Sequence, residues 1–209
     1  MCNIVKSYWG MDLKPLVVGK GSNTLAVVLP GIGYTLDRAT LEYSSSLALE
    51  LGFDLLKIEY GFQVGRDTFH PESEFNIIVE ESLALLKNTL NCKYKNIVFI
   101  GKSVGTCVQS ILNNSIVGYN MVNIYISPIN KTVDIGIKEN SLVITGEADP
   151  LLSKENDEKI ENINGVKFIS ISGANHALNV EGDSIKSLEI QVNIIKCIKK
   201  YLSQISLNY

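Results

Sequence analysis

Residues 97–106 read IVFIGKSVGT, and Ser103 in this segment has the residue type and the neighbours that covalent catalysis requires. Gly101 and Gly105 stand two positions before and two positions after it, which gives the pattern G-x-S-x-G. In a nucleophile elbow these positions are small because a strand and a helix approach closely at a sharp turn, and the turn exposes the serine hydroxyl. The apolar run before Ser103 predicts the strand, and the residues from Val104 onward predict the helix. We therefore expect Ser103 to act as a nucleophile.

The same segment has a second interpretation, because Gly101 is followed by Lys102 and Ser103 as at the end of a phosphate-binding loop. That motif reads G-x-x-x-x-G-K-[ST], and its first glycine lets the backbone curl around a phosphate. The position of that glycine is occupied here by Asn96, at the start of the predicted strand. Without a glycine-rich loop the phosphate-binding interpretation loses its main requirement, so the nucleophile interpretation is favoured.

A serine hydroxyl needs a general base within hydrogen-bond reach, and that base needs a partner that orients it. The chain has two histidines, which narrows the choice. His176 lies in the segment ISGANHAL, after a predicted strand, and it follows Ser103 in the chain order Ser…Asp/Glu…His. His70 precedes Ser103 and stands directly before Pro71, which is typical of a solvated loop histidine. We assign His176 as the general base.

The orienting acid should lie between the serine and the histidine in the chain. The predicted strand LVIT runs into GEADP, which places Asp149 on a loop at the carboxyl end of a strand and before a proline that helps to fix the turn. Glu147 is the chief alternative, because it is also acidic and lies near the same strand end. Asp149 is preferred because it extends further into the loop where the acid of a triad must sit.

Acyl transfer builds negative charge on a carbonyl oxygen, which fixed backbone N–H groups stabilise. The amide of Val104, the first residue of the helix, is the expected first donor. The loop in LPGIGYTLDR supplies the second, which we assign to the amide of Ile32, because Gly31 and Gly33 allow close backbone approach. The same loop resembles part of a dinucleotide-binding motif. The third glycine of that motif would fall at Leu36, so nucleotide binding is not favoured.

Short apolar runs alternate with segments of helical period, which is typical of a parallel sheet covered by helices. The predicted buried strands span 25–29, 54–58, 96–100, 122–126, 142–145 and 167–171. Four amphipathic helices are predicted around residues 36–47, 79–90, 104–112 and 185–202, and the last of them has Asp183 as its N-cap. A solvated helix is expected at 153–162, and residues 4–9 and 16–18 are candidate strands at one sheet edge. The pattern predicts one doubly wound α/β domain over residues 1–209.

The bulk composition excludes several classes of function. The chain has 19 Lys and Arg against 22 Asp and Glu, a net charge of −3, so no positive field attracts nucleic acid or anionic lipid. No segment has the ~20 apolar residues of a membrane span, and the amino terminus lacks the apolar core of a signal peptide. We expect a cytoplasmic protein with reduced thiols. The cysteines are scattered without a C-x-x-C pair, which argues against a zinc site: Cys2, Cys92, Cys107 and Cys197.

In this order, the segments LPGIG, GKSVG, GEADP and GANHAL resemble the α/β-hydrolase superfamily, specifically its small members without a lid, near the dienelactone-hydrolase-like and carboxylesterase-like groups. The resemblance implies a mostly parallel sheet with helices on both faces, no large cap domain, and a Ser103, Asp149 and His176 triad that needs no metal or organic cofactor. Many such proteins have His-Gly where this chain has Pro30 and Gly31. Dienelactone hydrolases proper use a cysteine nucleophile, so their specific activity is not implied.

Only 46 positions separate Ser103 from Asp149, which leaves no room there for a large lid. The site should therefore be open and accept a small or exposed acyl group. The loop 61–74 is the expected wall of the pocket, and a surface connector is the alternative interpretation of this loop. The predicted pocket residues come from the glycine-rich loop and from residues 60–62: Gly31, Gly33, Tyr34, Tyr60 and Phe62. The sequence predicts a serine hydrolase that cleaves an ester or thioester. The alternatives are an acyltransferase with the same triad and a binding or regulatory protein on the same fold. The acyl group, the leaving group and the oligomeric state are left open.

Overall fold

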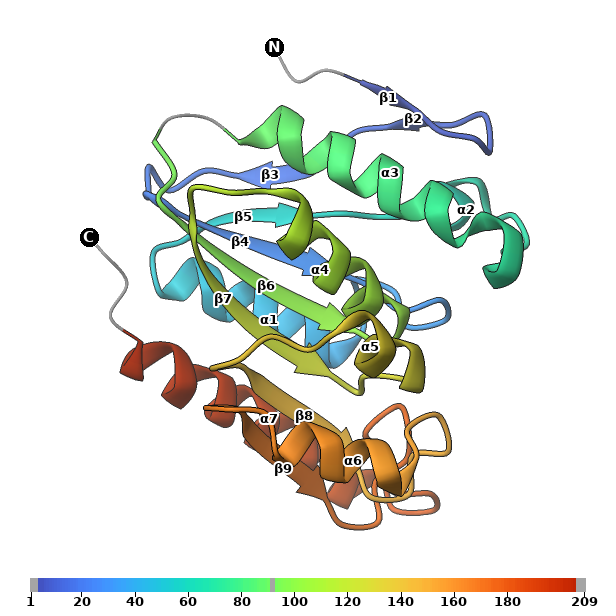
Figure 1. Cartoon of the computed structure of the whole chain (residues 1–209), viewed down its shortest axis with the longest axis vertical. Coiled ribbons are helices and arrows are strands. Elements are labelled where there is room, and N and C mark those ends of the chain that lie inside the picture. Colours follow the sequence, from blue (N-terminus) through green and yellow to red (C-terminus); the bar gives the residue numbers. More distant parts are fainter. Residues whose placement is uncertain (1–3, 91–92, 206–209) are drawn as a thin grey trace.

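The computed structural model describes residues 4–90 and 93–205, and a seven-stranded sheet forms its centre (Figure 1). The strands are β3 (Leu16–Val18), β4 (Thr24–Leu29), β5 (Asp54–Lys57), β6 (Asn96–Lys102), β7 (Asn120–Ile126), β8 (Leu142–Gly146) and β9 (Lys167–Ile171). Their spatial order is β3-β5-β4-β6-β7-β8-β9. The edge strand β3 pairs antiparallel with β5, and the other pairs are parallel. The six strands predicted from apolar runs are confirmed.

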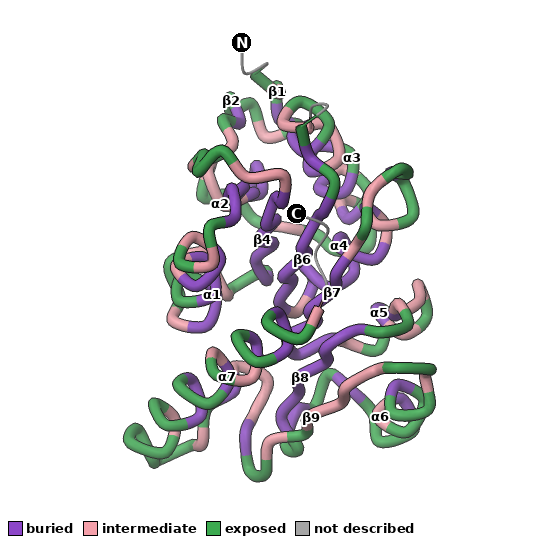
Figure 2. Tube along the Cα trace, turned by 90° about the vertical axis from the view of Figure 1, so that its left-hand side faces the viewer, coloured by how far each residue is buried: buried purple, intermediate pink, exposed green. Residues whose placement is uncertain are grey.

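The central strands form because their side chains are buried on both faces of the sheet. All residues of β4 and β6 are buried, and most are Val, Ile, Leu or Phe, which fit a pleated surface covered on both sides (Figure 2). In β6, Val98 and Ile100 pack into the core on one face, and Ile97 and Phe99 pack into the core on the other. The two pairs lie on different faces because successive side chains of a strand point to opposite sides of the sheet.

Helices cover both faces of the sheet (Figure 1). One face carries α1 (Ala39–Glu50) and α7 (Ser184–Gln204), which pack side by side. The opposite face carries α3 (Pro71–Thr89), α4 (Val104–Ser115), α5 (Asn130–Ile135) and α6 (Lys154–Glu161). The predicted fold class, a doubly wound sheet with helices on both faces and no large cap, is confirmed.

The helix predictions hold for α1, α3, α4, α6 and α7, and Asp183 caps α7 by accepting a hydrogen bond from the Lys186 amide at 2.8 Å. Two short helices were not predicted. One is α5, and the other is α2 (Gly61–Gly65). The segment 61–74, expected to be a loop, therefore consists of α2, a short loop and the first turn of α3.

The amino-terminal segment differs from the expectation in part. The predicted edge strand at 16–18 is confirmed as β3. Within the segment 4–9, only β1 (Val5–Lys6) is a strand, and it pairs with β2 (Asp12–Leu13) in a separate two-stranded sheet. The chain turns tightly at Gly10, which has φ 78°, so β1 pairs with its sequence neighbour and not with the main sheet.

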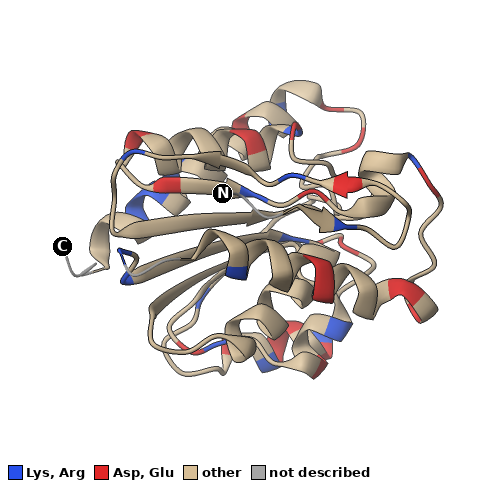
Figure 3. Cartoon of the chain, turned by 90° about the horizontal axis from the view of Figure 1, so that it is seen from above, with Lys and Arg blue, Asp and Glu red and all other residues tan. Residues whose placement is uncertain are grey.

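The carboxyl ends of β4, β6, β8 and β9 lie at one edge of the sheet because these strands are parallel. The predicted nucleophile, base, acid and oxyanion loop all follow directly after these strands, so the fold brings their segments to the same edge. Basic and acidic residues are interspersed over the helices and loops (Figure 3). Within the described ranges, none of the helices combines the length and apolar character that a membrane span needs.

Candidate active site

Ser103 lies on a strained turn between β6 and α4. Its backbone has φ 55° and ψ −123°, and residues with a Cβ rarely adopt a positive φ. The two glycines of the motif are required by close contacts. A Cβ on Gly101 would lie 2.7 Å from the backbone oxygen of Gly105, and a Cβ on Gly105 would lie 2.5 Å from the backbone oxygen of Pro30. The strand, turn and helix predicted around Ser103 are thus present.

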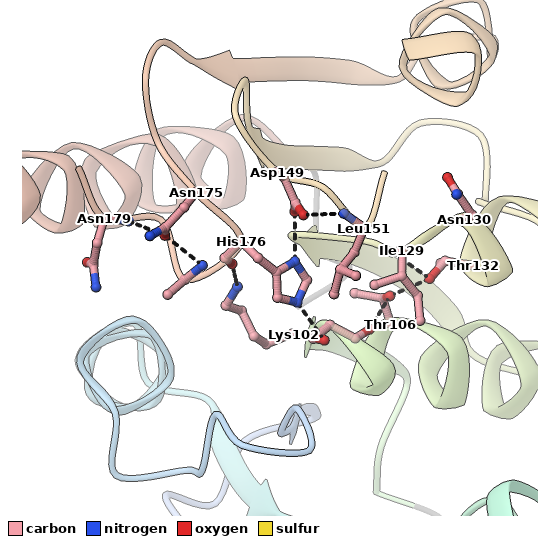
Figure 4. Close-up of polar contacts among 12 residues, drawn as sticks. Lys102, Thr106, Ile129, Asn130, Thr132, Asp149, Leu151, Asn175, His176 and Asn179 are labelled. Atoms are coloured by element: carbon pink, nitrogen blue, oxygen red, sulfur yellow. Dashed lines mark hydrogen bonds and ion pairs between the residues drawn. The ribbon is translucent and has the colours of Figure 1, made fainter. Parts of the chain in front are cut away.

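The turn brings Ser103 within reach of His176, which comes from a loop at the same sheet edge. The ring of His176 in turn points toward Asp149 on a second loop (Figure 4). His176 Nε2 lies 2.8 Å from Ser103 Oγ, and His176 Nδ1 lies 2.7 Å from Asp149 Oδ2. The side chain of Asp149 is almost fully buried, whereas that of His176 is one quarter exposed. In this arrangement the imidazole can accept the serine proton while the carboxylate orients the ring and stabilises its charged form.

The acid and the base are each held by further hydrogen bonds. The second carboxylate oxygen of Asp149 accepts from the backbone amide of Leu151 at 2.9 Å. The loop of His176 is joined to the loop of the acid, because the carbonyl of Ala174 accepts from the amide of Ala148 at 3.0 Å. These bonds fix the two loops relative to each other.

Glu147, the alternative acid, lies away from the imidazole. Its carboxylate accepts hydrogen bonds from the hydroxyl of Ser172 at 2.7 Å and from the amide of Gly173 at 3.3 Å. The bond from Ser172 lowers the pKa of this exposed carboxyl group. Its position leaves Asp149 as the acid that contacts His176.

His70 also lies where a solvated histidine is expected. It is exposed at the N-cap of α3, and its backbone amide donates to a side-chain oxygen of Glu74 at 2.7 Å. Pro71 occupies the first position of the helix, where a missing N–H costs little. His70 therefore has a local role at a helix end.

The two predicted oxyanion donors flank the nucleophile. Within the described chain, no acceptor is hydrogen-bonded to the amides of Val104 or Ile32, whereas the amide of Gly31 donates to the carbonyl of Tyr34 at 2.9 Å. Val104 begins α4, so its N–H lies at the positive end of the helix dipole. A Cβ on Gly31 would lie 3.1 Å from the Cβ of Ser103, so this glycine permits the close approach of the loop.

Gln63 in α2 holds the same loop, a contact that the sequence did not predict. Its side-chain Nε2 donates to the carbonyl of Gly31 at 2.9 Å and to that of Ile32 at 3.2 Å. The Gly31 carbonyl belongs to the same peptide plane as the amide of Ile32, and the Ile32 carbonyl belongs to the next plane, so these bonds fix the plane that carries the expected donor and the one that follows it. About thirty positions separate Gln63 from the loop. No local sequence pattern could therefore have indicated the contact.

A cavity of about 330 Å³ opens beside Ser103 and His176. Of the pocket residues predicted from the glycine-rich loop, Gly33 and Tyr34 line it and Gly31 does not. The rest of the wall is apolar and comes from Ile32, Leu151 and Ala177. Ile32 and Leu151 are 43% and 48% exposed, so the cavity is open to solvent at these side chains.

The prediction that Tyr60 and Phe62 line this pocket is wrong. Both side chains are buried in the core formed with α3 and α4. The short helix α2 turns Phe62 onto Phe69, with ring centroids 4.5 Å apart, and places Tyr60 against Phe62. Tyr60 supports the site indirectly, because its hydroxyl donates to the carbonyl of Pro30 at 3.1 Å.

The described residues contain no group of three or more His, Cys, Asp or Glu side chains that could hold a metal ion. The two described cysteines, Cys107 and Cys197, are both free thiols.

No protein-family model matches the chain, and no curated protein matches it in sequence. Solved structures match its fold over nearly the whole length. A dienelactone hydrolase from Anabaena variabilis has a TM-score of 0.71 and 14% sequence identity, with 96% of each chain covered. An α/β serine hydrolase homologue from Coxiella burnetii has a TM-score of 0.67 and 17% identity, covering 94% of this chain and 96% of the other.

A serine hydrolase without a lid from Xanthomonas campestris has a TM-score of 0.62 and 14% identity, and the match covers 95% of this chain and 93% of the other. At such low identity the likeness establishes the fold. The chain therefore has the α/β-hydrolase fold, in a form without a large cap.

Proposed function

We propose that this protein is a serine hydrolase that cleaves an ester or thioester with a small or exposed acyl group. The observation that supports it best is the continuous chain of contacts from Ser103 Oγ to His176 at 2.8 Å and on to Asp149 at 2.7 Å. In the proposed reaction Ser103 attacks the acyl carbon, and His176 takes the hydroxyl proton and returns it to the leaving group. Water, activated by His176, then releases the acyl group from Ser103.

The oxygen of the tetrahedral intermediate would be stabilised by the amides of Val104 and Ile32. Both amides belong to backbone segments that flank Ser103, and neither is occupied by an acceptor of the described chain. Donors fixed in advance stabilise developing charge without having to reorganise, and the loss of one such donor costs about 3 kcal/mol in other enzymes.

The apolar wall formed by Ile32, Tyr34, Leu151 and Ala177 supports an uncharged acyl group as the substrate. The cavity is open and small, which favours short acyl chains over long ones. An acyltransferase would use the same groups with another acceptor in place of water.

The test is a screen of short-chain aryl esters, thioesters and peptide amides with the wild type and with Ser103→Ala. The proposal predicts ester hydrolysis that Ser103→Ala abolishes. Ser127→Ala is the matched control, because Ser127 also follows a parallel strand and has a positive φ of 44° but does not contact His176. Equal activity in wild type and Ser103→Ala would refute the proposal.

A further inference from the structure

Lys102, the residue before Ser103, is fully buried. It is the last residue of β6 and continues the row of Val98 and Ile100, which packs into the core on the side of α1 and α7. Burial lowers the pKa of its ammonium group to about 7, although the negative charge of Asp149 acts in the opposite direction. Lysine is almost never fully buried unless it is paired, so this position calls for a reason.

An ion pair does not explain the burial of Lys102. The salt bridges within the described ranges include no carboxylate partner for Lys102. Its Nζ donates one hydrogen bond, to the backbone carbonyl of His176 at 2.6 Å (Figure 4). It also lies 5.0 Å from the ring centroid of Tyr34, within the range of a cation–π contact.

Through these contacts one side chain joins three segments of the site. The backbone of Lys102 continues directly into Ser103, its Nζ contacts the loop of His176, and Tyr34 belongs to the loop of the expected oxyanion donor at Ile32. Among the described residues, no other donor reaches the carbonyl of His176. A fixed carbonyl restricts the backbone from which the imidazole projects, and catalysis is sensitive to displacements of about 1 Å.

We propose that Lys102 is a positioning residue that holds the backbone of His176 at the separation from the nucleophile turn where Nε2 reaches Ser103 Oγ. The catalytic part of this proposal rests on the proposed hydrolase function. The positioning role explains why a lysine occupies a buried position where an apolar side chain would make the fold more stable. Strained or costly features persist where function requires them.

The variant Lys102→Met removes the donor and keeps an unbranched side chain of similar length. With active sites counted by fluorophosphonate titration, kcat should fall tenfold or more per active site, while KM for a short ester changes less than twofold. The melting temperature should stay the same or rise. Lys154→Met is the matched control, because Lys154 Nζ also donates to a loop carbonyl, that of Glu147 at 3.1 Å, but its side chain is largely exposed. This control should keep the wild-type kcat.

A readout without turnover separates this proposal from the proposed function. The chain has only two histidines, so NMR of ¹⁵N-labelled imidazoles can follow His176 with His70 as the internal reference. In Lys102→Met the signal of the His176 Nδ1 proton should shift or broaden, and the signals of His70 should not change. If the protein hydrolyses no ester, the proposed function is wrong, but the His176 signals of wild type and Lys102→Met can still be compared.

Two results would overturn the role of Lys102. One is an unchanged kcat together with an unchanged His176 signal in Lys102→Met. The other is a variant that does not fold or that melts at a lower temperature, because that behaviour assigns the lysine a structural role.

Discussion

The buried charged groups at the amino and carboxyl ends of the central strands differ in how fully they are hydrogen-bonded. Asp54 begins β5 with a fully buried side chain that accepts hydrogen bonds from the Lys20 amide at 2.6 Å, the Ser22 amide at 3.0 Å and the Tyr94 hydroxyl at 2.8 Å, and from Lys93 Nζ. Burial by itself would raise the pKa of this carboxyl group, but these donors outweigh burial and lower it to about 2. The charged form is thus well satisfied.

Lys102 ends β6 at the opposite edge, and its charged form is poorly satisfied. One hydrogen bond to a carbonyl accompanies full burial, and burial lowers its pKa to about 7. Ser103, the next residue, has a positive φ. The comparison indicates that the amino edge is built for stability, whereas the carboxyl edge contains features that stability alone would not favour.

The largest effect expected at the carboxyl edge is that of Asp149→Asn. An amide at this position no longer holds the imidazole in the tautomer that can accept the serine proton, so kcat/KM for a short aryl ester should fall by about 10⁴-fold. Thermal unfolding should change little. Glu147→Gln is the control, because Glu147 bonds Ser172 and Gly173 and not His176, and its rate should stay close to wild type. Equal losses in both variants would contradict the assignment of the acid.

The second effect concerns stability, and its sign is unusual for a change beside an active site. The pKa of Lys102 is about 7 in the fold against an ordinary value of 10.5, so folding is penalised increasingly as the pH falls from 10.5 to about 7. At pH 7 this penalty is on the order of 5 kcal/mol. Lys102→Met removes this penalty but leaves the carbonyl of His176 without its donor, which costs about 1–3 kcal/mol. Denaturant unfolding should therefore show that Lys102→Met is more stable at pH 7.

The same measurement at pH 10 gives the control. The lysine is then neutral in the fold, and the pH is close to its ordinary pKa of 10.5 when unfolded, so the penalty for losing the proton falls to about 1 kcal/mol. The stability difference between Lys102→Met and wild type should shrink there. A difference that does not depend on pH would show that buried charge is not its cause.

At the amino edge we expect a substitution to lower stability and to leave activity almost unchanged. Asp54→Asn should lower the free energy of unfolding by about 2 kcal/mol, because hydrogen bonds to a charged group are lost, while kcat/KM should stay within twofold. The carboxyl pKa is depressed from 3.8 to about 2, so the contribution of Asp54 is present above pH 3.8 and is lost as the pH falls through about 2. Acid unfolding monitored by circular dichroism should show this dependence in the wild type and not in the variant.

The smallest effect expected is that of Gln63→Ala. Loss of the bonds to the carbonyls of Gly31 and Ile32 should loosen the loop of the second oxyanion donor and lower kcat/KM about tenfold, less than the loss of a donor itself. Gln63→Glu keeps the shape but presents oxygen atoms to these carbonyls, so it should lose at least as much activity. A fully active Gln63→Glu variant would show that the loop needs no such support.

Much of this arrangement could be predicted from the sequence because it is encoded locally. Apolar runs predict the strands, and the residues that follow each strand must lie at the same edge of a parallel sheet. Ser103 follows directly after such a strand, and Asp149 and His176 lie in the loops that follow two others, so their convergence depends on topology and not on fine packing. The burial of Lys102 could also have been recognised, since it stands in phase with Val98 and Ile100.

Other features depend on packing between distant segments. Tyr60 and Phe62 stand beside glycine in a segment interpreted as a loop, and only the short helix α2 turns them into the core. The same helix brings Gln63 to the glycine-rich loop. Short helices such as α2 and α5 have too few residues for a helical period to be distinguished in sequence.

The most direct test of the account is to treat the protein with a fluorophosphonate probe and to locate the adduct by mass spectrometry. The account predicts one adduct on Ser103 in the wild type, none in Ser103→Ala, and much slower labelling in His176→Ala. No adduct in the folded wild type, or an adduct that persists in Ser103→Ala, would contradict the claim that the carboxyl edge of this sheet activates Ser103.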